Sequence, residues 1–185
     1  NLNWYYTKPG DLVVDLFAGG GMAIDVCKFD DDDFGNRKCR AFDIEPHFVR
    51  TDIERWDVVA KGLPDFGRAQ LVFLDPPYWK QKKGEYSGDA TNLANLELDT
   101  FHDELTKIVR ACRNVSEYTA LIIGATFHER DWIDHASEMV SRIGAPFQRI
   151  IVPYNTQQYG GAHVIRAKKG RYMLNLYRDL LVWRQ

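Results

Sequence analysis

The chain has 185 residues, which is the size of a single domain at roughly 150 residues per domain. Hydrophobic residues make up 45%, charged residues 27% and aromatic residues 13% of it, which excludes a disordered, collagen-like or coiled-coil protein, and no apolar run approaches the roughly 18 residues of a transmembrane helix. The 24 basic and 26 acidic residues give a formal net charge of -2, which argues against non-specific coating of nucleic acid but is compatible with a local basic face.

The cysteines and histidines bear on the setting of the protein. Cys27, Cys39 and Cys112 form no CxxC pair, and the five histidines show no zinc-like spacing. This pattern predicts reduced thiols, an intracellular setting and no metal site. The chain begins at Asn1 without Met or a signal-peptide pattern, so we expect a trimmed start and a missing N-terminal segment.

The first half of the chain alternates short apolar runs with helical spacing, which predicts an α/β fold with a parallel sheet and crossover helices. Residues 12–17 (LVVDLF) form a buried strand that enters a glycine turn, and apolar residues recur at helical spacing over 22–29. Residues 40–43 and 70–75 form two further strands, and each of these ends in an acid.

A helix is predicted to start near Asp99 or Thr100, because Thr100 and Asp103 fit a capping box. The apolar residues that follow recur at helical spacing up to Cys112. The run 118–124 (YTALIIG) then predicts a central strand.

The second half continues with a helix over 131–143, which Gly144 is expected to end. Residues 148–154 and 179–183 form the last two strands. No apolar pattern of helical length separates these two strands, so we expect them to pair antiparallel.

Two stretches are predicted to be loops. The acidic run 30–33 has a spacing similar to a calcium-binding EF-hand, but Phe34 stands where a ligand is needed and no Glu falls at the twelfth position. We therefore interpret it as a solvated loop. The stretch 155–177 is longer than most connections in compact domains, and such loops are usually functional or disordered.

The glycine-rich segment 15–21 (DLFAGGG) lies between a strand and a helix, where a ligand can approach the backbone closely. A dinucleotide site is the alternative, but GxGxxG fails because Ile24 occupies the last glycine position, and no GK[ST] follows for a phosphate loop. Asp15 suits a ligand with a cationic ammonium group and repels pyrophosphate. A plain glycine turn also remains open at this point.

Asp43 ends the next strand, at about the distance from the glycines where an acid holds a ribose. A strand-end Asp can also be a turn residue or a helix cap. The preceding glycine loop favours the ribose role.

Residues 75–78 (DPPY) are the most specific signal in the chain. Two prolines directly after a buried strand fix the backbone and remove two donors. A carboxylate and a proline carbonyl remain as acceptors, which suit the two hydrogens of a planar amino group. Tyr78 adds a flat ring that can stack on a base. The alternative is a simple turn with an exposed ring.

These segments together resemble a known family. Residues 6–21 (YTKPGDLVVDLFAGGG), 42–46 (FDIEP) and 75–78 (DPPY) look like the amino-group DNA methyltransferases, which use S-adenosylmethionine (SAM) to methylate adenine N6 or cytosine N4. The final run 179–184 (DLLVWR) is similar to the family's last strand. The resemblance implies a Rossmann-like SAM methyltransferase fold, a seven-stranded and mostly parallel sheet with the last strand antiparallel. Together with the chain length and the cysteines, it leads us to expect a single catalytic domain over 1–185 and a cytoplasmic, prokaryotic or phage-like setting.

The resemblance also assigns roles to residues. The cofactor-binding residues would be Asp15, Phe17, Ala18, Gly19, Gly21, Asp43, Ile44 and Asp52. Within this set, Asp43 would hold the ribose and Asp52 the adenine amino group, with Phe42 or Ile53 beside that ring. The catalytic residues would be Asp75, Pro76, Pro77 and Tyr78. The chain departs from the family at Gly20 and Met22, where Ser and Thr are common, and this departure bears on how the methionine carboxylate is held.

Two basic stretches are candidates for DNA contact. The candidate DNA-binding residues are Lys80, Lys82, Lys83, Gln157, Gln158, Arg166, Lys168, Lys169 and Arg171. The first three would form a mobile flap or a solvated charge cluster. In the second group, Gln can read adenine edges and Arg or Lys can hold phosphates, whereas the alternatives are a solvated face or a cover over the SAM pocket.

We therefore expect methyl transfer from SAM to an exocyclic amino group in DNA. Adenine N6 is favoured over cytosine N4 because Asp at the first DPPY position is commoner among adenine enzymes of the family. The rival functions are an RNA or protein amino-group methyltransferase and a non-catalytic SAM- or DNA-binding subunit. The stretch between Asp43 and Asp75 is too short for a recognition domain, so a loop, a missing N-terminal segment or a partner subunit would choose the DNA site.

Overall fold

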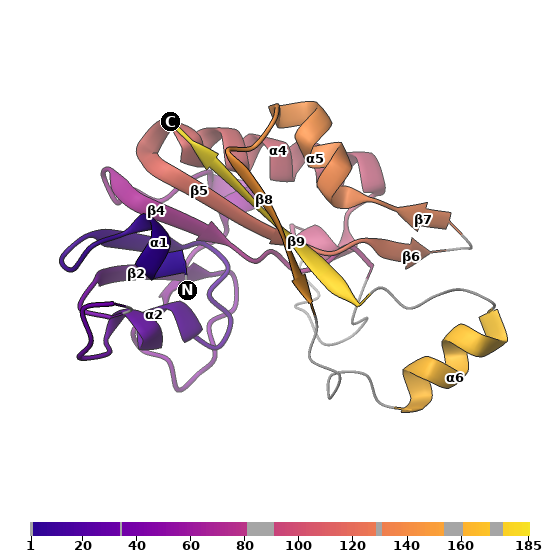
Figure 1. Ribbon diagram of the computed structural model, residues 1–185, viewed down its shortest axis with the longest axis horizontal. Coiled ribbons are helices and arrows are strands. Elements are labelled where there is room, and N and C mark those ends of the chain that lie inside the picture. Colours follow the sequence, from indigo (N-terminus) through magenta and orange to yellow (C-terminus); the bar gives the residue numbers. More distant parts are fainter. Residues whose placement is uncertain (1, 34, 81–90, 129–130, 154–160, 171–175) are drawn as a thin grey trace.

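The structure is a computed structural model that describes residues 2–33, 35–80, 91–128, 131–153, 161–170 and 176–185 (Figure 1). Its elements in chain order are α1 (Leu2–Tyr6), β1 (Leu12–Asp15), α2 (Met22–Cys27), β2 (Lys38–Asp43), β3 (Glu54–Arg55), α3 (Val58–Lys61), β4 (Ala69–Leu74), η1 (Leu93–Asn95), α4 (Leu98–Val115), β5 (Ser116–Ile123), β6 (Thr126–His128), β7 (Asp131–Ile133), α5 (His135–Ile143), β8 (Gln148–Pro153), α6 (Gly161–Gly170) and β9 (Tyr177–Arg184). In the described part of the chain, no helix is both long enough and apolar enough to cross a membrane.

Seven strands form one sheet in the order β3-β2-β1-β4-β5-β9-β8. The pairs from β3 to β5 are parallel, whereas β9 runs antiparallel to β5 and to β8. The prediction of a mostly parallel seven-stranded sheet whose last strand is antiparallel is therefore confirmed, as is the antiparallel pairing of the last two strands.

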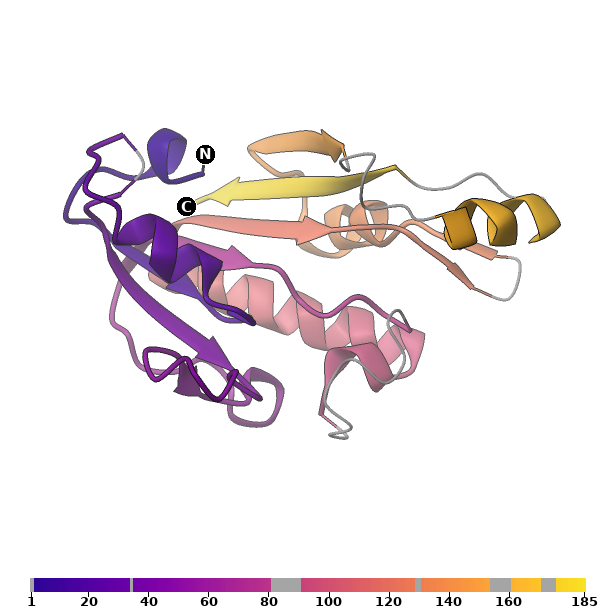
Figure 2. The ribbon, with the colours of Figure 1, turned by 90° about the horizontal axis from the view of Figure 1, so that it is seen from below.

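The main core lies between the sheet and the helices α4 and α5, which pack beside each other (Figures 1 and 2). Phe101, Leu105 and Met139 from these helices are fully buried against sheet residues such as Trp183. The indole N–H of Trp183 donates to the Gly144 carbonyl oxygen over 3.0 Å, which fastens the end of α5 to β9. A second hydrophobic cluster is formed by buried residues of α1, α2 and the central strands, among them Tyr6, Cys27 and Ala120.

The predicted start of the long helix is wrong by about one residue, and its predicted cap is wrong. Helix α4 begins at Leu98 with Glu97 at the N-cap, and no side chain caps it. Thr100 therefore lies inside the helix and forms no capping box with Asp103. The apolar stripe that predicted the helix is confirmed, because it includes residues of α4 that lie in the main core.

The predicted helix over 131–143 begins too early. Residues 131–133 form β7, which pairs antiparallel with β6, and α5 begins at His135. Asp134 is the N-cap because its carboxylate accepts a hydrogen bond from the Ser137 backbone N–H over 3.0 Å. Because the capping carboxylate of Asp134 sets the start of the helix, residues 131–133 lie outside it and can pair with β6. The end of α5 at Gly144 is confirmed.

The connection between the last two strands contains a helix that the sequence analysis did not predict. Helix α6 lies within the predicted loop 155–177, and both views place it off the end of the sheet (Figures 1 and 2). Because β8 is parallel to β1 and β4 and β9 is antiparallel to β8, this connection leaves and enters the sheet at the edge where β1 and β4 end.

Candidate functional site

Three carboxylates meet at the carboxyl edge of the sheet. Strand β1 lies between β2 and β4, and its last residue, Asp15, pairs with Ala41 and Phe73. Asp43 and Asp75 each follow these partners by two residues, so the topology brings all three acids to one edge. In open α/β sheets this edge is where ligands bind.

Asp15 is the most deeply buried of the three acids, with 4% of its surface exposed. Burial is the main cause that raises the pKa of its carboxyl to about 7, the hydrogen bond from the Phe17 backbone N–H opposes the shift, and the negative charges of Asp75 and Asp43 add to it. Asp15 therefore holds a proton through much of the range below neutral pH. A cationic group placed beside it would favour release of that proton.

The glycine loop that follows Asp15 is held by backbone hydrogen bonds. The Ala18 N–H donates to the Phe42 carbonyl oxygen over 3.0 Å, and the Gly21 N–H donates to the Ala18 carbonyl oxygen over 2.7 Å. Gly19 has a φ of 48°, and a Cβ atom placed on Gly19 or Gly20 would meet nothing within 4 Å. This part of the loop is therefore open to the approach of a ligand.

Asp43 faces the glycine loop, and its predicted contact with a ribose stays a prediction. Its carboxylate oxygens accept hydrogen bonds from the Gly19 N–H over 2.8 Å and the Glu45 N–H over 2.9 Å. These two bonds fix the orientation of the carboxylate and tie the end of β2 to the loop after β1.

Arg50 is a residue of this site that sequence reasoning missed. Its guanidinium group donates to the Gly20 carbonyl oxygen over 2.9 Å and to Asp25 of α2 over 3.0 Å. The φ of 83° at Gly21 favours glycine, and a Cβ atom there would lie 2.4 Å from the guanidinium group, so a larger residue would displace Arg50 from its present contacts. Arg50 thereby clamps the loop after β2 onto the glycine loop.

Asp52 is engaged in ion pairs with two cations. Its carboxylate lies 2.9 Å from Arg50 Nε and 2.8 Å from Lys28 Nζ. These hydrogen bonds hold the pKa of Asp52 far below its ordinary value. The contact of Asp52 with an adenine amino group stays a prediction. In this structure the Asp52 carboxylate pairs with Arg50 and Lys28.

The two side chains expected to flank the adenine ring are both buried. Phe42 is 1% exposed and belongs to the main core, and Arg40 covers its ring at 4.9 Å from the centroid. Ile53 is 6% exposed and packs with Ala18. Ile44 is half-buried. A flanking role for Phe42 or Ile53 therefore stays a prediction, and it would require a ring to reach a buried side chain.

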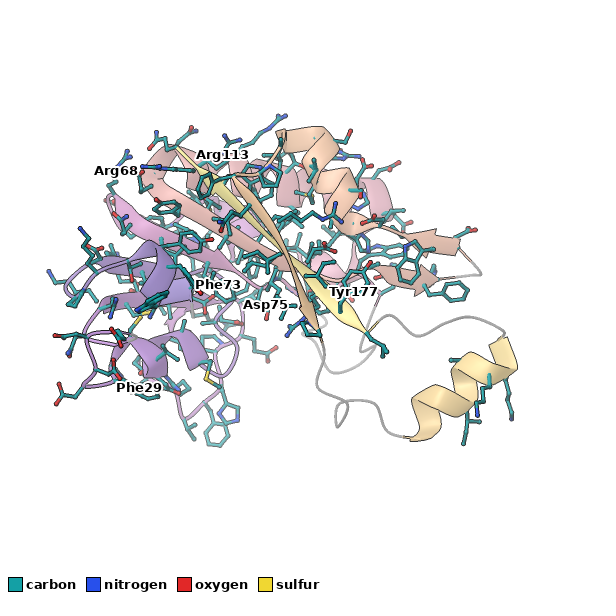
Figure 3. The ribbon with its side chains drawn as sticks, in the orientation of Figure 1. Phe29, Arg68, Phe73, Asp75, Arg113 and Tyr177 are labelled. Carbon is teal, nitrogen blue, oxygen red and sulfur yellow. The ribbon has the colours of Figure 1, made fainter. Side chains whose placement is uncertain are left out.

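The DPPY motif begins directly after β4. Pro76 is buried and Pro77 half-buried, and the Tyr78 hydroxyl donates to Asp75 Oδ1 over 3.0 Å. A residue that the sequence analysis missed, Arg178 of β9, donates from Nη1 to the Tyr78 hydroxyl oxygen over 3.0 Å and lies 3.8 Å from Asp75 Oδ2. Figure 3 labels Asp75 near Tyr177, at the end of the sheet where β4 ends and β9 begins.

A buried histidine pair is connected through Thr126 to Trp79, the residue that follows this motif. His102 Nε2 is 2.9 Å from His135 Nδ1, and His135 Nε2 is 3.0 Å from Thr126 Oγ1. The Thr126 hydroxyl reaches the carbonyl oxygen of Trp79, the residue after the motif, over 3.5 Å. Burial lowers the pKa of both rings, that of His135 to about 4 with a further contribution from His102. The pair joins α4, α5 and β6 to the segment that follows DPPY.

The structure places only some of the candidate DNA-binding residues. The Lys80 side chain contacts the segment before α4: its Nζ donates to the Asn95 carbonyl oxygen over 3.2 Å and lies 4.0 Å from Glu97. Lys168 and Lys169 are exposed in the last turn of α6. Arg166 lies in the same helix. Lys82, Lys83, Gln157, Gln158 and Arg171 lie outside the described residues.

Several solved structures have a similar fold. A SAM-dependent methyltransferase from Archaeoglobus fulgidus gives a TM-score of 0.55 at 13% identity, over 100% of this chain and 91% of that one. An rRNA methylase from Streptococcus thermophilus gives 0.52 at 12% identity, over 96% and 89%. A provisionally assigned class I SAM-dependent methyltransferase from Listeria monocytogenes gives 0.57 at 10% identity, over 100% of this chain but only 56% of that one. This chain therefore spans little more than half of the Listeria protein.

No protein-family model matches the chain, and no curated protein does either. At such low identities the structural likenesses establish the fold and not the reaction. The sheet order, the antiparallel β9 and the site at the carboxyl edge together show that the chain has the Rossmann-like fold of SAM-dependent methyltransferases.

Proposed function

We propose that the protein transfers a methyl group from SAM to an exocyclic amino group of a base in DNA, with adenine N6 favoured over cytosine N4. The observation that carries the proposal is the position of the DPPY motif. It follows β4, the neighbour of β1, and so lies at the same sheet edge as the glycine loop and Asp43. Direct methyl transfer requires this adjacency of a donor site and an acceptor site.

The residues on the donor side fit SAM. Gly19 and Gly20 leave open space beside the backbone, and the carboxyl of Asp15 suits an ammonium group. Both oxygens of Asp43 accept backbone N–H groups, yet an ionised carboxylate has about four acceptor positions and can also receive ribose hydroxyls. SAM supplies an electrophilic methyl group on a sulfonium centre.

On the acceptor side, the chain's own groups would hold the target. Asp75 accepts a hydrogen bond from the amino group, and the Pro76 carbonyl is a second acceptor. Proline contributes no N–H at that position, so acceptors predominate there. The negative charge of Asp75 also offsets the positive charge that grows on the nitrogen during transfer. Tyr78 presents an aromatic face for the base.

DNA is the substrate class that we favour. The connection between β8 and β9 starts and ends at the edge that carries the site, and its helix exposes Lys168 and Lys169. Basic side chains beside an active site suit the phosphates of a nucleic acid. In a duplex the target base must be flipped out of the stack.

Two rivals share the main features. An RNA or protein amino-group methyltransferase would use the same two sites, and the rRNA methylase from Streptococcus thermophilus has a similar fold. A non-catalytic subunit would bind SAM or DNA without transfer. The substrate assay below separates these possibilities.

The test measures transfer of tritiated methyl groups from SAM to duplex DNA, single-stranded DNA, RNA and glutamine-containing peptides. We expect label in DNA as N6-methyladenine. The variant Asp75→Ala should lose about 100-fold or more of the rate, as for loss of one preorganised electrostatic group, with little change in SAM affinity. Asp30→Ala is the matched control, because Asp30 is exposed in the loop between α2 and β2 at the opposite sheet edge.

The outcomes separate the candidates. Label in RNA or peptide alone would favour the first rival, and SAM binding without transfer to any substrate would favour the second. A protein that binds no SAM would refute the proposal. Methylome sequencing of a host that expresses the gene would then give the recognition sequence.

A further inference from the structure

Arg178 connects the two ends of the DPPY motif. Its Nη1 donates to the Tyr78 hydroxyl oxygen over 3.0 Å and lies 3.8 Å from Asp75 Oδ2. The Tyr78 hydroxyl in turn donates to Asp75 Oδ1 over 3.0 Å. The Arg178 side chain is 25% exposed, so this triangle of polar contacts is partly shielded from water.

The backbone of Arg178 is fixed from both sides. It lies near the start of β9, where it pairs with Val152 of β8. The next residue, Asp179, pairs with Ile123 of β5 and accepts a hydrogen bond from Arg149 Nε over 2.8 Å. Successive residues of a strand point to opposite faces, so the Arg149–Asp179 pair lies on the face of β9 opposite to the one from which Arg178 reaches the motif. A strand-borne side chain holds a more defined position than one on a loop.

We propose that Arg178 is a positioning residue of the acceptor site, an inference that rests on the proposed function. The Tyr78 hydroxyl oxygen accepts a hydrogen bond from Arg178 while the hydroxyl group donates one to Asp75, and hydrogen bonds in such a chain strengthen one another. This arrangement fixes the ring that stacks on the base.

Arg178 has a second effect on the site. Asp15, Asp43 and Asp75 place three carboxylates at one sheet edge, and Arg178 brings a positive charge to the one that contacts the target. Opposite charge at this distance offsets part of the repulsion among the acids. The position of Asp75 is thereby set before the substrate arrives.

The kinetic test compares Arg178→Met with the control Arg149→Met. Arg149 lies on the neighbouring strand β8 and forms an ion pair with Asp179, and none of its contacts given above is to the DPPY motif. We expect Arg178→Met to lower kcat on DNA about 100-fold, as for misplacement of a reacting group, and to leave the Kd of S-adenosylhomocysteine within about threefold. Arg149→Met should keep its kcat. Tyr78→Phe added to Arg178→Met should cost little more than Arg178→Met alone, because both act through one contact.

A second readout needs no turnover. In protein labelled with ¹³C at the tyrosine ζ-carbons, the Tyr78 signal is the one that disappears in Tyr78→Phe. It should shift in Arg178→Met and stay in place in Arg149→Met. If Arg178→Met does not fold, Arg178→Lys, which lacks the planar fork, takes its place in both tests.

The proposal is overturned if the Tyr78 signal does not move, if kcat stays within twofold of wild type, or if the effects of the two substitutions multiply. A shifted signal in a protein that methylates none of the tested substrates would refute the proposed function and still support the placement of Tyr78 by Arg178.

Discussion

We predict that the titration of Asp15 makes the affinity for SAM and its product depend on pH, in a direction set by the raised pKa of this carboxyl. Its pKa is raised to about 7, chiefly by burial. If the ammonium group of S-adenosylhomocysteine binds only beside the ionised carboxylate, affinity follows the ionised fraction, which is about one half at pH 7.0 and about 3% at pH 5.5. Affinity should therefore fall about 15-fold between these pH values, and about 0.9 proton should be released on binding at pH 6.0.

Isothermal titration calorimetry in two buffers of different ionisation enthalpy measures both quantities. Asp15→Asn should remove the pH dependence and the proton release, whereas Asp30→Asn should keep them. A wild-type affinity that is flat from pH 5.5 to 7.0, with no proton released, would refute the assignment.

Stability gives a check that involves no ligand. An acid whose pKa is raised in the folded state favours folding below its unfolded pKa, and this contribution is lost as pH rises through the folded pKa. A rise from 3.8 to about 7 corresponds to a cost of about 4 kcal/mol at pH 8. Asp15→Asn should therefore stabilise the ligand-free protein at pH 8 and have little effect at pH 4, as measured by urea unfolding.

Three further predictions concern other parts of the molecule. Asp43→Ala should weaken S-adenosylhomocysteine binding by about 1.5–3 kcal/mol, the value of a hydrogen bond to a charged group, and calorimetry that gave an affinity equal to that of Asp30→Ala would remove Asp43 from the site. His135, with its pKa lowered to about 4, contributes stability that is present above pH 6.5 and lost as pH falls toward 4. The free energy of unfolding at pH 5 should therefore be about 2 kcal/mol lower than above pH 6.5, and a His135→Gln variant with the same loss between these pH values would contradict the assignment. Replacing Lys168 and Lys169 with Ala should weaken DNA binding across sequences and reduce the salt slope by about 1 per lost phosphate contact, and an unchanged slope measured by fluorescence anisotropy would argue that α6 does not contact DNA.

The meeting of three acids at one sheet edge could be predicted because its signals are local. Asp15, Asp43 and Asp75 each end an apolar run, and parallel strands bring such ends to one edge. Arg50 and Arg178 could not be predicted in the same way. An arginine in a loop or strand is an ordinary surface residue, and the partners of these two, Gly20 and Tyr78, lie far away in sequence.

Secondary structure followed a similar division. Apolar spacing located α4, but the residues that begin a helix depend on which group satisfies its first N–H groups, so the start and the cap were predicted wrongly. The hairpin of β6 and β7 replaced the first turn of a predicted helix, because strand pairing requires a partner segment that helical spacing does not reveal.

The sequence by itself determined the α/β alternation, the glycine turn after β1 and the double-proline segment after β4, because steric limits and periodicity act within a few residues. Only the tertiary structure decided the order of the strands, the insertion of β9 between β5 and β8, and the contacts of Arg50 and Arg178. It also decided the pKa of Asp15, because burial and the charges of Asp43 and Asp75 depend on how distant segments pack around one carboxyl group.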